Sequence, residues 1–551
     1  MTDAVNYKTI IEGSTTMYFP ADQESTVFYN PVQVQNRDLS ILMISLAAER
    51  RAVRQVVKAQ RKAFRSEGVS NKGLSTKMEE YEASLDSARV LSEQDPALGL
   101  TILDALAASG LRSIRYWKEI PGTKHVTIND LDAAAVERAW TNLKHNNVMD
   151  VVLEQNDTRD RGIHVQNGDA THELYLSRRP QLLHVDESRP PSLKPRWDVI
   201  DLDPYGSAAP FLDAAVQGIE DGGFLCVTCT DMAALGGSHP ETCFGRYASM
   251  PIPRAGYLQE MALRILLHSL ATTAAKYGRT IKPILSVGMN FYIRVFVEVY
   301  DDKAGVNALS LKLGRVFQST QCASFHIKPV GQLGGKNGNG YQPGRVPDFG
   351  QSVEIDESIK VGGPIWLGPL HDKTVVKVAL DRLESKDETV LPSMKWIATK
   401  DRLRGLLTSC HEELSDVPLF YNLPQMAQTL NATTPPLIKV KAALLNAGFR
   451  VSGYHKEPQA IKTNAPNQVL WDVLRVWCKE NPPNSTKNHE CSVAHKILTK
   501  TPTTHVDFSV PMALRVDRGI ARFPQNPEPH WGPKKAATGH KRKAESDADR
   551  K

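Results

Sequence analysis

The chain has 551 residues, of which 41% are apolar and 23% charged, and its formal net charge at pH 7 is +6. A chain of this length exceeds the size at which one hydrophobic core keeps growing, so two or three domains are expected. The composition is ordinary for a globular protein, and the absence of any run of about 18 apolar residues argues against a membrane span. The modest positive charge permits a nucleic-acid partner without arguing for one.

The seven cysteines are an odd number spread thinly along the chain, which favours a reducing compartment over a disulfide framework. Cys226 and Cys229 have C-x-x-C spacing, but they lie in an apolar run that is typical of a buried strand. Alternate side chains of a strand occupy opposite faces, so we expect two packed core thiols rather than a metal or redox site.

Between residues 100 and 300, short β-rich apolar runs alternate with helical patterns, which predicts an α/β fold with a parallel sheet. The expected strands are 100–106, 125–130, 163–168, 197–202 and 223–228, and the expected helices begin near Gly110 and cover 133–146 and 257–277. Two further runs, 282–287 and 292–300, can pair antiparallel around Gly288. Five parallel strands closed by such a hairpin fit a Rossmann-like methyltransferase sheet better than a dehydrogenase sheet.

Composition also predicts the domain organisation. The first domain is expected at 1–320, with a polar insertion at about 50–98. A second, C-terminal α+β domain is expected at 321–525, and it includes a helix that ends at Gly448. It starts with a glycine-rich segment, 331–350, which indicates a flexible connection. The remainder, 526–551, is basic and rich in proline, and is expected to be disordered.

The ends of the first three predicted strands carry residues suited to a ligand. The turn after the first strand is built from small residues and opens a helix at Gly110, which lets backbone N–H groups approach a ligand. The second strand ends in Asp130, placed to accept hydrogen bonds from ribose hydroxyls. The third ends in Asp169 and Ala170, suited to an adenine contact. Because the carboxyl ends of parallel strands share one sheet edge, these residues predict a ligand crevice.

The fourth strand ends in Asp201-Leu-Asp203-Pro204-Tyr205, the most specific signal in the chain. An exocyclic purine amine is a poor nucleophile because its lone pair is delocalised into the ring. A carboxylate and a backbone carbonyl fixed by a proline can accept hydrogen bonds from such an amine, and a neighbouring aromatic ring can stack on the base. Asp203, Pro204 and Tyr205 supply these parts, although Asp-Pro-aromatic also occurs as a plain turn.

With these motifs in their order, the chain resembles the tRNA (guanine-N2-)-dimethyltransferase family, whose target is guanine 26. The resemblance covers residues 7 to about 300 and continues more weakly to about 480. Besides the motifs above, it rests on the segments Glu12-Gly-Ser-Thr, Phe28-Tyr-Asn-Pro, Asn36-Arg-Asp-Leu-Ser and Thr230-Asp-Met-Ala-Ala-Leu.

The resemblance implies a donor site and a catalytic group. S-adenosyl-L-methionine would be held by Arg37, Arg112, Asp130, Asp169 and Ala170. Asp203 would be the catalytic carboxylate beside Pro204, with Tyr205 in the place of the family's aromatic residue. The partner would be tRNA, gripped by the C-terminal domain; no membrane and no obligatory protein partner are expected.

The sequence departs from a pattern found in some members of the family, in which two C-x-x-C pairs form a zinc site just after the catalytic domain. The corresponding stretch here holds Cys322 alone, and no partner pair follows before Cys410. A four-thiolate zinc site is therefore not expected, and we predict no metal site.

Two basic segments have alternative interpretations. Cationic residues recur at helical spacing over 50–65, which fits either a helix that tracks phosphates or a solvated basic face. The segment 533–543 has two basic clusters and fits either a nuclear import signal or a flexible RNA-binding arm. The N-terminus lacks the pattern of a secretory or mitochondrial signal, so a nuclear location is expected, with a mitochondrial pool left open.

Three other functions remain as alternatives. A nicotinamide-dependent dehydrogenase is disfavoured because the chain lacks G-x-G-x-x-G and carries the Asp-Pro-Tyr motif. A non-enzymatic RNA chaperone has no need of Asp203. Within the methyltransferases, the main alternative is an enzyme that methylates guanine N2 in another RNA or at another tRNA position.

Overall fold

The computed structural model describes residues 7–20, 29–67, 71–154, 159–178, 195–289, 291–334, 340–345, 359–385, 392–483, 489–514 and 519–526. Its centre is a seven-stranded sheet with the order β5-β4-β3-β6-β7-β9-β8. These strands are β3 (Leu100–Asp104), β4 (Thr123–Asp130), β5 (Gly162–Asn167), β6 (Trp197–Leu202), β7 (Ile219–Cys229), β8 (Arg279–Met289) and β9 (Tyr292–Asp301). The first five are parallel, and β9 pairs antiparallel with both β7 and β8. The expected α/β class and the closing hairpin are confirmed.

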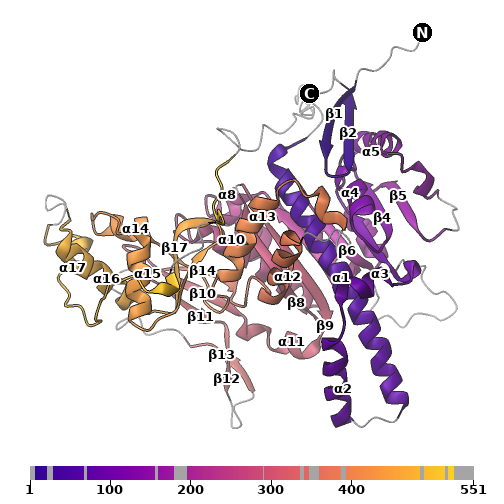
Figure 1. The fold of residues 1–551 in the computed structure, drawn as a ribbon. Helices are drawn as coiled ribbons and strands as arrows, with labels where there is room; N and C mark the ends of the chain where they lie inside the picture. The colour runs from indigo at the N-terminus through magenta and orange to yellow at the C-terminus, as the bar shows by residue number, and fades with distance from the viewer. Residues whose placement is uncertain are drawn as a thin grey trace, which may run out of the picture.

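Helices cover both faces of this sheet (Figure 1). One face, which includes Ile102 and Val199, shares a core with α1 (Val34–Ser66), α4 (Leu111–Glu119), α12 (Lys373–Glu384) and α13 (Lys400–Glu412). The other packs against α6 (Ala170–Leu176), α7 (Ala209–Gly218) and α10 (Leu258–Ala275). Cys226 belongs to the first core and Cys229 to the second, both as free thiols, so they lie on opposite faces as expected.

The described segments beyond residue 320 share hydrophobic clusters with the central sheet. Strand β14 (Ile359–Trp366) pairs with β10 (Leu313–Ser319), which also pairs with β11 (Phe325–Pro329). Helices α12 and α13 bury apolar side chains such as Val376 and Leu407 in the same cluster as α1. Residues on both sides of the expected boundary thus pack in one cluster on the same face of the central sheet, which composition alone does not reveal.

The rest of the C-terminal part is α+β, as expected. A sheet of order β15-β17-β16 is surrounded by helices. Its elements are β15 (Tyr421–Asn422), β16 (Val451–Tyr454), β17 (Glu457–Thr463), α14 (Leu423–Thr429), α15 (Leu437–Asn446), α16 (Asn467–Glu480) and α17 (Val493–Leu498). Gly448, with a φ of +85°, follows the end of α15, where the sequence predicts the helix to stop.

The glycine-rich segment differs from the flexible connection that its composition predicts. Its described part forms an antiparallel hairpin, β12 (Gly331–Gly334) and β13 (Gly340–Pro343), which projects from the body of the molecule (Figure 1). Backbone hydrogen bonds hold a sheet together without side chains, so glycine density does not by itself prevent pairing. Residues 335–339 and 346–350 lie outside the described part of the chain.

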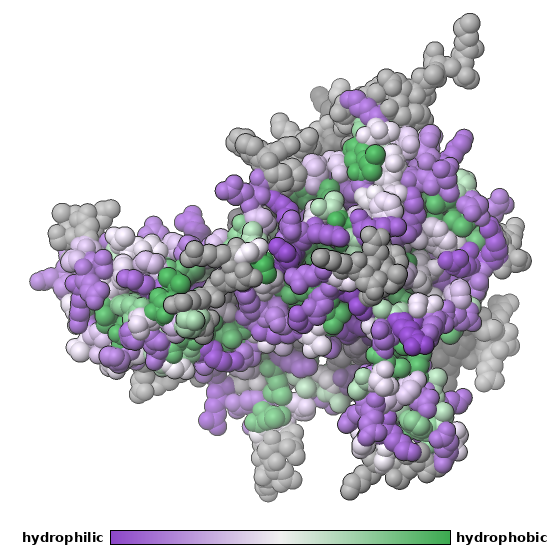
Figure 2. Space-filling view, viewed as in Figure 1, coloured by the Kyte–Doolittle hydropathy of each residue, from purple (hydrophilic) through white to green (hydrophobic). Residues whose placement is uncertain are grey.

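The basic stretch 50–65 is the second half of α1, a single continuous helix. Arg51 pairs with Asp198, and Arg54 pairs with Glu298, so part of this stretch holds the helix against the sheet. Four other cations are exposed: Lys58, Arg61, Lys62 and Arg65. They lie on an arm formed with α2 (Asn71–Ala83), and Figure 2 shows hydrophilic residues over most of it. Whether these cations contact RNA stays a prediction.

Helix α5 (Ala133–His145) packs Ala139 and Leu143 against β4 and β5. Four further helices are short: α3 (Ser87–Ser92), α8 (Met232–Leu235), α9 (Pro240–Tyr247) and α11 (Lys303–Asn307). No helix in the described part of the chain combines the length and apolar character needed to cross a membrane. The basic segment 533–543 lies outside the described residues.

Candidate active site

A cavity of about 940 Å³ lies at the carboxyl ends of the parallel strands. Its walls come from the turns after β3, β4 and β6, from the start of α1 and from the β8–β9 turn. Among the residues that the sequence analysis selected, those lining it are Arg37, Arg112, Asp130, Asp203, Pro204 and Tyr205. A sheet edge of this kind is where ligands bind in open α/β folds.

The turn between β3 and α4 brings backbone atoms to the cavity. Gly110 has a φ of +74°, and a Cβ there would lie 3.1 Å from the Cβ of Ala139 on α5 (Ala133–His145), so the close approach of the two helices requires glycine. Asn129 ties the neighbouring strand ends together, because its Nδ2 donates to the carbonyls of Ala105 (2.9 Å) and Gly168 (3.1 Å). The strand ends that form the crevice are therefore fixed relative to one another.

Asp130 and Asp169 both lie at this edge but differ in their contacts. Asp130 accepts hydrogen bonds from the backbone N–H groups of Ala108 (2.8 Å) and Asp132 (2.9 Å), and it lines the cavity. Asp169 is exposed, and its carboxylate caps α6 by accepting from the N–H of Thr171. Neither Asp169 nor Ala170 lines the cavity, so their adenine contact stays a prediction.

Arg37 reaches the cavity from the first turn of α1. Its Nε and Nη2 donate to the two oxygens of Glu12 at 2.6 and 2.5 Å, a bidentate pair. Glu12 ends β1 (Tyr7–Glu12), which pairs with β2 (Thr15–Pro20). Burial would raise the pKa of Glu12, but Arg37 and Arg115 overcome it and lower this pKa to about 2. Sequence reasoning missed Glu12's partnership, since 25 residues separate it from Arg37.

Asp203 is held on one side by Arg112, which lies in the first turn of α4. One Nη of Arg112 donates to Oδ2 of Asp203, and the other donates to Ser40 (3.0 Å) and Asp201 (3.3 Å). In the described part of the chain, Oδ1 of Asp203 accepts no hydrogen bond. Arg112 thus orients the carboxylate and leaves one oxygen for a ligand.

Tyr205 and the β8–β9 turn give the cavity aromatic surface. The Tyr205 side chain is 63% exposed, and burial of the remainder together with the charge of Asp203 raises its pKa to about 12, so the phenol stays neutral. Phe291 and Tyr292 line the cavity as well. The sequence analysis did not select these two residues, because nothing in the β8–β9 hairpin indicates that its turn reaches the site.

A buried charge network lies behind Asp203. Asp201 receives hydrogen bonds from Arg294 at 3.0 and 2.9 Å, and also from Arg112 and Tyr116. Asp104, at the end of β3, is a further buried carboxylate of this network. Burial and the nearby charge of Asp201 raise the pKa of Asp104 to about 7. The signal that could have revealed this network is a single arginine in the apolar run of β9.

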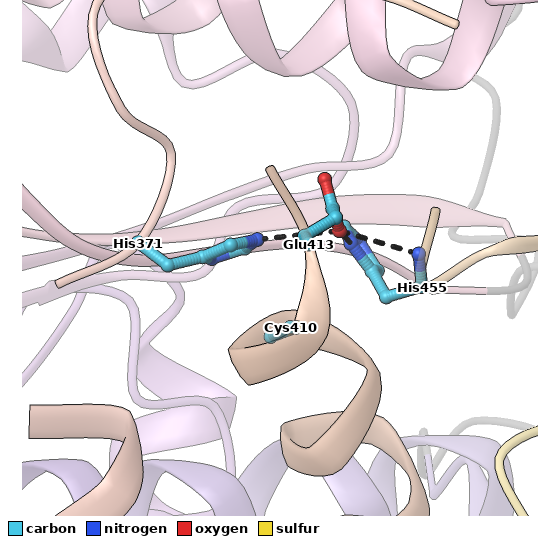
Figure 3. A group of neighbouring side chains, drawn as sticks. All are labelled: His371, Cys410, Glu413 and His455. Carbon is cyan, nitrogen blue, oxygen red and sulfur yellow. Dashed lines mark hydrogen bonds and ion pairs between the residues drawn. The ribbon is translucent and has the colours of Figure 1, made fainter. Parts of the chain in front are cut away.

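A second polar cluster lies in the C-terminal part, where His371, Cys410, Glu413 and His455 are all buried (Figure 3). One ligand-type atom from each lies within 4.8 Å of the others, which raises the question of a metal. The two imidazoles lie on either side of the Glu413 carboxylate. Nδ1 of His455 is 2.8 Å and Nε2 of His371 is 3.6 Å from the same oxygen.

The outer nitrogens of both imidazoles face backbone donors. The N–H of Gly288 donates to Nε2 of His455 at 2.9 Å, and the N–H of Ser286 approaches Nδ1 of His371 at 3.4 Å. The protons therefore lie on the inner nitrogens and point at Glu413, whereas a metal-bound histidine normally donates from its outer nitrogen. Lys462 adds an ammonium 2.8 Å from the other Glu413 oxygen. We interpret the cluster as the Glu413 carboxylate held by the two imidazoles and by Lys462. Through His455 and Gly288, it links the C-terminal part to β8.

Replacing Glu413 by Gln should destabilise the fold by roughly 3 kcal/mol, because it removes one of the two carboxylates, Glu413 and Glu260, that pair with buried Lys462. The readout is the apparent melting temperature. Glu412→Gln is the matched control, since it removes an ion pair with Arg522 that is partly exposed, which is worth about 1 kcal/mol or less. Equal shifts for both variants, or a wild-type melting temperature that falls on adding a chelator, would contradict this interpretation.

Comparisons with known proteins identify the family of this chain. A family model described as N2,N2-dimethylguanosine tRNA methyltransferase matches residues 6–475. The tRNA (guanine(26)-N(2))-dimethyltransferase of Schizosaccharomyces pombe is 38% identical over 95% of this chain and 92% of that protein. The human protein of the same name is 37% identical over 97% of this chain and 78% of its own length. The structure of Trm1 from Pyrococcus horikoshii with S-adenosyl-L-methionine has a TM-score of 0.61 and 25% identity, covering 84% of this chain and 98% of that one. The chain therefore belongs to the N2,N2-dimethylguanosine tRNA methyltransferase family.

Proposed function

We propose that this protein transfers two methyl groups from S-adenosyl-L-methionine to the exocyclic N2 of guanine 26 in tRNA. Family membership supports the reaction, since the fission yeast and human relatives are named for it. The observation that carries the proposal is Asp203, a carboxylate with one oxygen fixed by Arg112 and the other directed to no group among the described residues, at the rim of a large cavity.

The cavity suits the methyl donor. Asp130 would accept hydrogen bonds from the ribose, and backbone atoms of the β3–α4 turn would contact the nucleoside. Arg37 would bind the carboxylate of the methionine part through Nη1, which has no partner in the described part of the chain. The bound donor would supply an electrophilic methyl group on its sulfonium. Asp169 and Ala170 would contact the adenine, as the resemblance implies.

Asp203 would act on the guanine amine. Its Oδ1 accepts a hydrogen bond from one N–H, and the Pro204 carbonyl accepts from the other when the amine carries two hydrogens. These contacts turn the nitrogen lone pair toward the methyl donor, so that positioning carries most of the rate. Arg112, which the resemblance assigns to the donor, would act here by holding Asp203 in place.

Tyr205 would stack on the target base. A guanine N2 in paired RNA lies in the minor groove, so the base has to leave its stack, at a cost of a few kcal/mol. Stacking on an exposed aromatic ring returns about 1–3 kcal/mol of this cost. The C-terminal part, 321–525, would supply more by gripping the body of the tRNA.

The decisive experiment is nucleoside mass spectrometry of unmodified tRNA incubated with the protein and S-adenosyl-L-methionine. N2,N2-dimethylguanosine should appear with the natural transcript and be absent when guanine 26 is replaced by adenine. Dimethylguanosine in both transcripts would place the target elsewhere in the tRNA. No methylated guanosine in either, from folded protein that binds the donor, would exclude tRNA guanine N2 as the substrate.

Asp130→Ala should weaken donor binding about tenfold or more, because a carboxylate that accepts hydrogen bonds from two hydroxyls is lost. Isothermal titration calorimetry with S-adenosyl-L-methionine measures the effect. Asp132→Ala is a suitable control, since Asp132 lies two residues on and caps α5 rather than lining the cavity. Donor affinity unchanged in Asp130→Ala would remove the ribose contact from the proposed site.

A nuclear location rests on the basic segment 533–543. That segment, which fits either an import signal or an RNA-binding arm, lies outside the described residues.

A further inference from the structure

A second cavity, of about 530 Å³, adjoins the active-site cavity. Val32 and Tyr292 line both, so the two spaces are separated only by shared side chains. The second cavity lies between the start of α1, the β8–β9 turn, α13, the β16–β17 turn and the segment 519–526. A ligand bound in the active-site cavity would therefore lie next to the second cavity.

The charges around the second cavity are of one sign. Arg402, Lys456 and Arg522 line it, and no Asp or Glu among the described residues does so. Arg522 is neutralised by Glu412, with N–O distances of 2.5 and 2.8 Å. Arg402 donates to the Gln525 carbonyl, and burial lowers its pKa. Burial lowers the pKa of Lys456 as well, against the opposing effect of Glu457. Such partly desolvated cations favour an anionic ligand.

Lys456 is presented on a rigid turn. It follows His455, whose ring is fixed between Gly288 and Glu413. The Glu413 cluster of Figure 3 thus positions both the β16–β17 turn that carries Lys456 and the end of β8 that leads to Tyr292. A cation held in this way loses less conformational freedom on binding than one on a mobile loop.

Apolar side chains line this cavity as well. Met289, Leu406 and Phe523 are among them, and Phe523 offers an aromatic ring that is 44% exposed. Cations together with apolar or aromatic surface are the two features that single-stranded nucleic-acid sites combine. A small inorganic anion would use only the first of them.

We propose that this cavity binds the nucleotide that flanks the target guanosine, with the phosphodiester on Arg402 and Lys456 and the base or ribose against the apolar side chains. The proposal rests on the proposed function, in that it takes RNA as the substrate. The second cavity would be a subsite that holds the RNA strand beside the flipped base. While this subsite is occupied, the target base would be kept from returning to its stack.

The test pairs protein variants with chemically altered RNA. Lys456→Gln and Arg402→Gln are compared with Lys303→Gln, an exposed cation at the start of α11, which follows the end of β9 at the opposite sheet edge. Affinity for unmodified tRNA is measured over a range of salt concentrations. We expect each pocket variant to bind about tenfold more weakly and its salt slope to fall by about 1, with no change for Lys303→Gln.

A methylphosphonate in place of one phosphodiester removes a single charge from the RNA. At one of the two linkages beside the target guanosine, it should weaken wild-type binding about tenfold but have little further effect on Lys456→Gln. At a linkage six nucleotides away, it should affect both proteins equally. The proposal would be overturned if a methylphosphonate at each of the two flanking linkages reduced the RNA affinity of the wild type and of both pocket variants by the same factor.

The subsite and the reaction can fail separately. Coupling here means that the methylphosphonate weakens the pocket variants less than the wild type. If the wild type forms dimethylguanosine but shows no coupling, the subsite is wrong and the proposed function stands. Coupling without dimethylguanosine would support the subsite and remove the reaction. Calorimetry of Lys456→Gln with S-adenosyl-L-methionine provides a further criterion. A merely structural defect would weaken donor binding as well. We expect Lys456→Gln to lose affinity for tRNA alone.

Discussion

Asp203→Asn should reduce methylation of tRNA by at least about a hundredfold, with donor affinity retained within a few fold. The substitution preserves the size of the side chain, and its amide oxygen can still accept from Arg112. The amide NH2 then takes the place of Oδ1 and faces the guanine amine, so that two donors oppose each other. The lone pair of the amine is no longer directed at the methyl donor, and kcat falls rather than the affinity for S-adenosyl-L-methionine.

The comparison needs a control carboxylate outside the cavity. Asp213 on α7 suits this purpose, because it accepts hydrogen bonds from Tyr175 and Tyr277 and does not line the cavity. Single-turnover rates with saturating donor, measured for wild type, Asp203→Asn and Asp213→Asn, separate chemistry from binding. A rate for Asp203→Asn within tenfold of wild type would show that its carboxylate does not orient the amine.

The sheet could be predicted from the sequence because each strand carries its own signal. In β6 every residue is buried, and its apolar residues are interrupted only by Asp198 and Asp201; the turns between strands fall at small or acidic residues. The observed strand limits differ from the predicted ones by a few residues. Strand β7 begins at Ile219 and not at 223, and β8 begins at Arg279 and not at 282. Local hydrophobic periodicity fixes the elements but not their exact limits.

The sequence reveals those cavity residues that lie at strand ends. It does not reveal those whose position depends on contacts between residues far apart in the chain. Asp130 and Asp203 are visible because Asp130 is the last residue of β4 and Asp203 directly follows β6. The contributions of Glu12 and of the β8–β9 turn are not, since ion pairs and packing across many residues leave no periodic signal. Likewise, Arg51 and Arg54 have the spacing of a phosphate-binding face, yet they pair with carboxylates of the sheet. A charge pattern alone does not distinguish the two uses.

The same reasoning explains the shared core. The sequence beyond residue 320 has the composition of a second domain, and its helices have apolar faces of ordinary width. Which surface those faces cover is decided by tertiary packing, and α12 and α13 cover α1. A glycine-rich run suggests a linker, but backbone pairing turns its described part into the hairpin β12–β13.

Arg294→Met should destabilise the protein by about 3–5 kcal/mol, the cost of leaving a buried charge without its main partner. Both Arg294 and Asp201 are fully buried, and the guanidinium also donates to Thr228 (2.6 Å) and Ser40 (2.9 Å). Arg112 remains beside Asp201 and would be drawn toward it. Because Arg112 also fixes Asp203, the variant should lose methylation rate even where it remains folded.

The double variant Arg294→Met, Asp201→Asn distinguishes a lost charge balance from lost packing. Removing both charges leaves no uncompensated carboxylate, so the double variant should recover part of the stability that the single variant loses. Arg450→Met removes an exposed ion pair with Asp416 and should cost about 1 kcal/mol or less. Chemical denaturation midpoints compare the three variants. If Arg294→Met and the double variant unfold at the same midpoint, the network stabilises the fold through packing, and Asp201 does not depend on Arg294 for its charge.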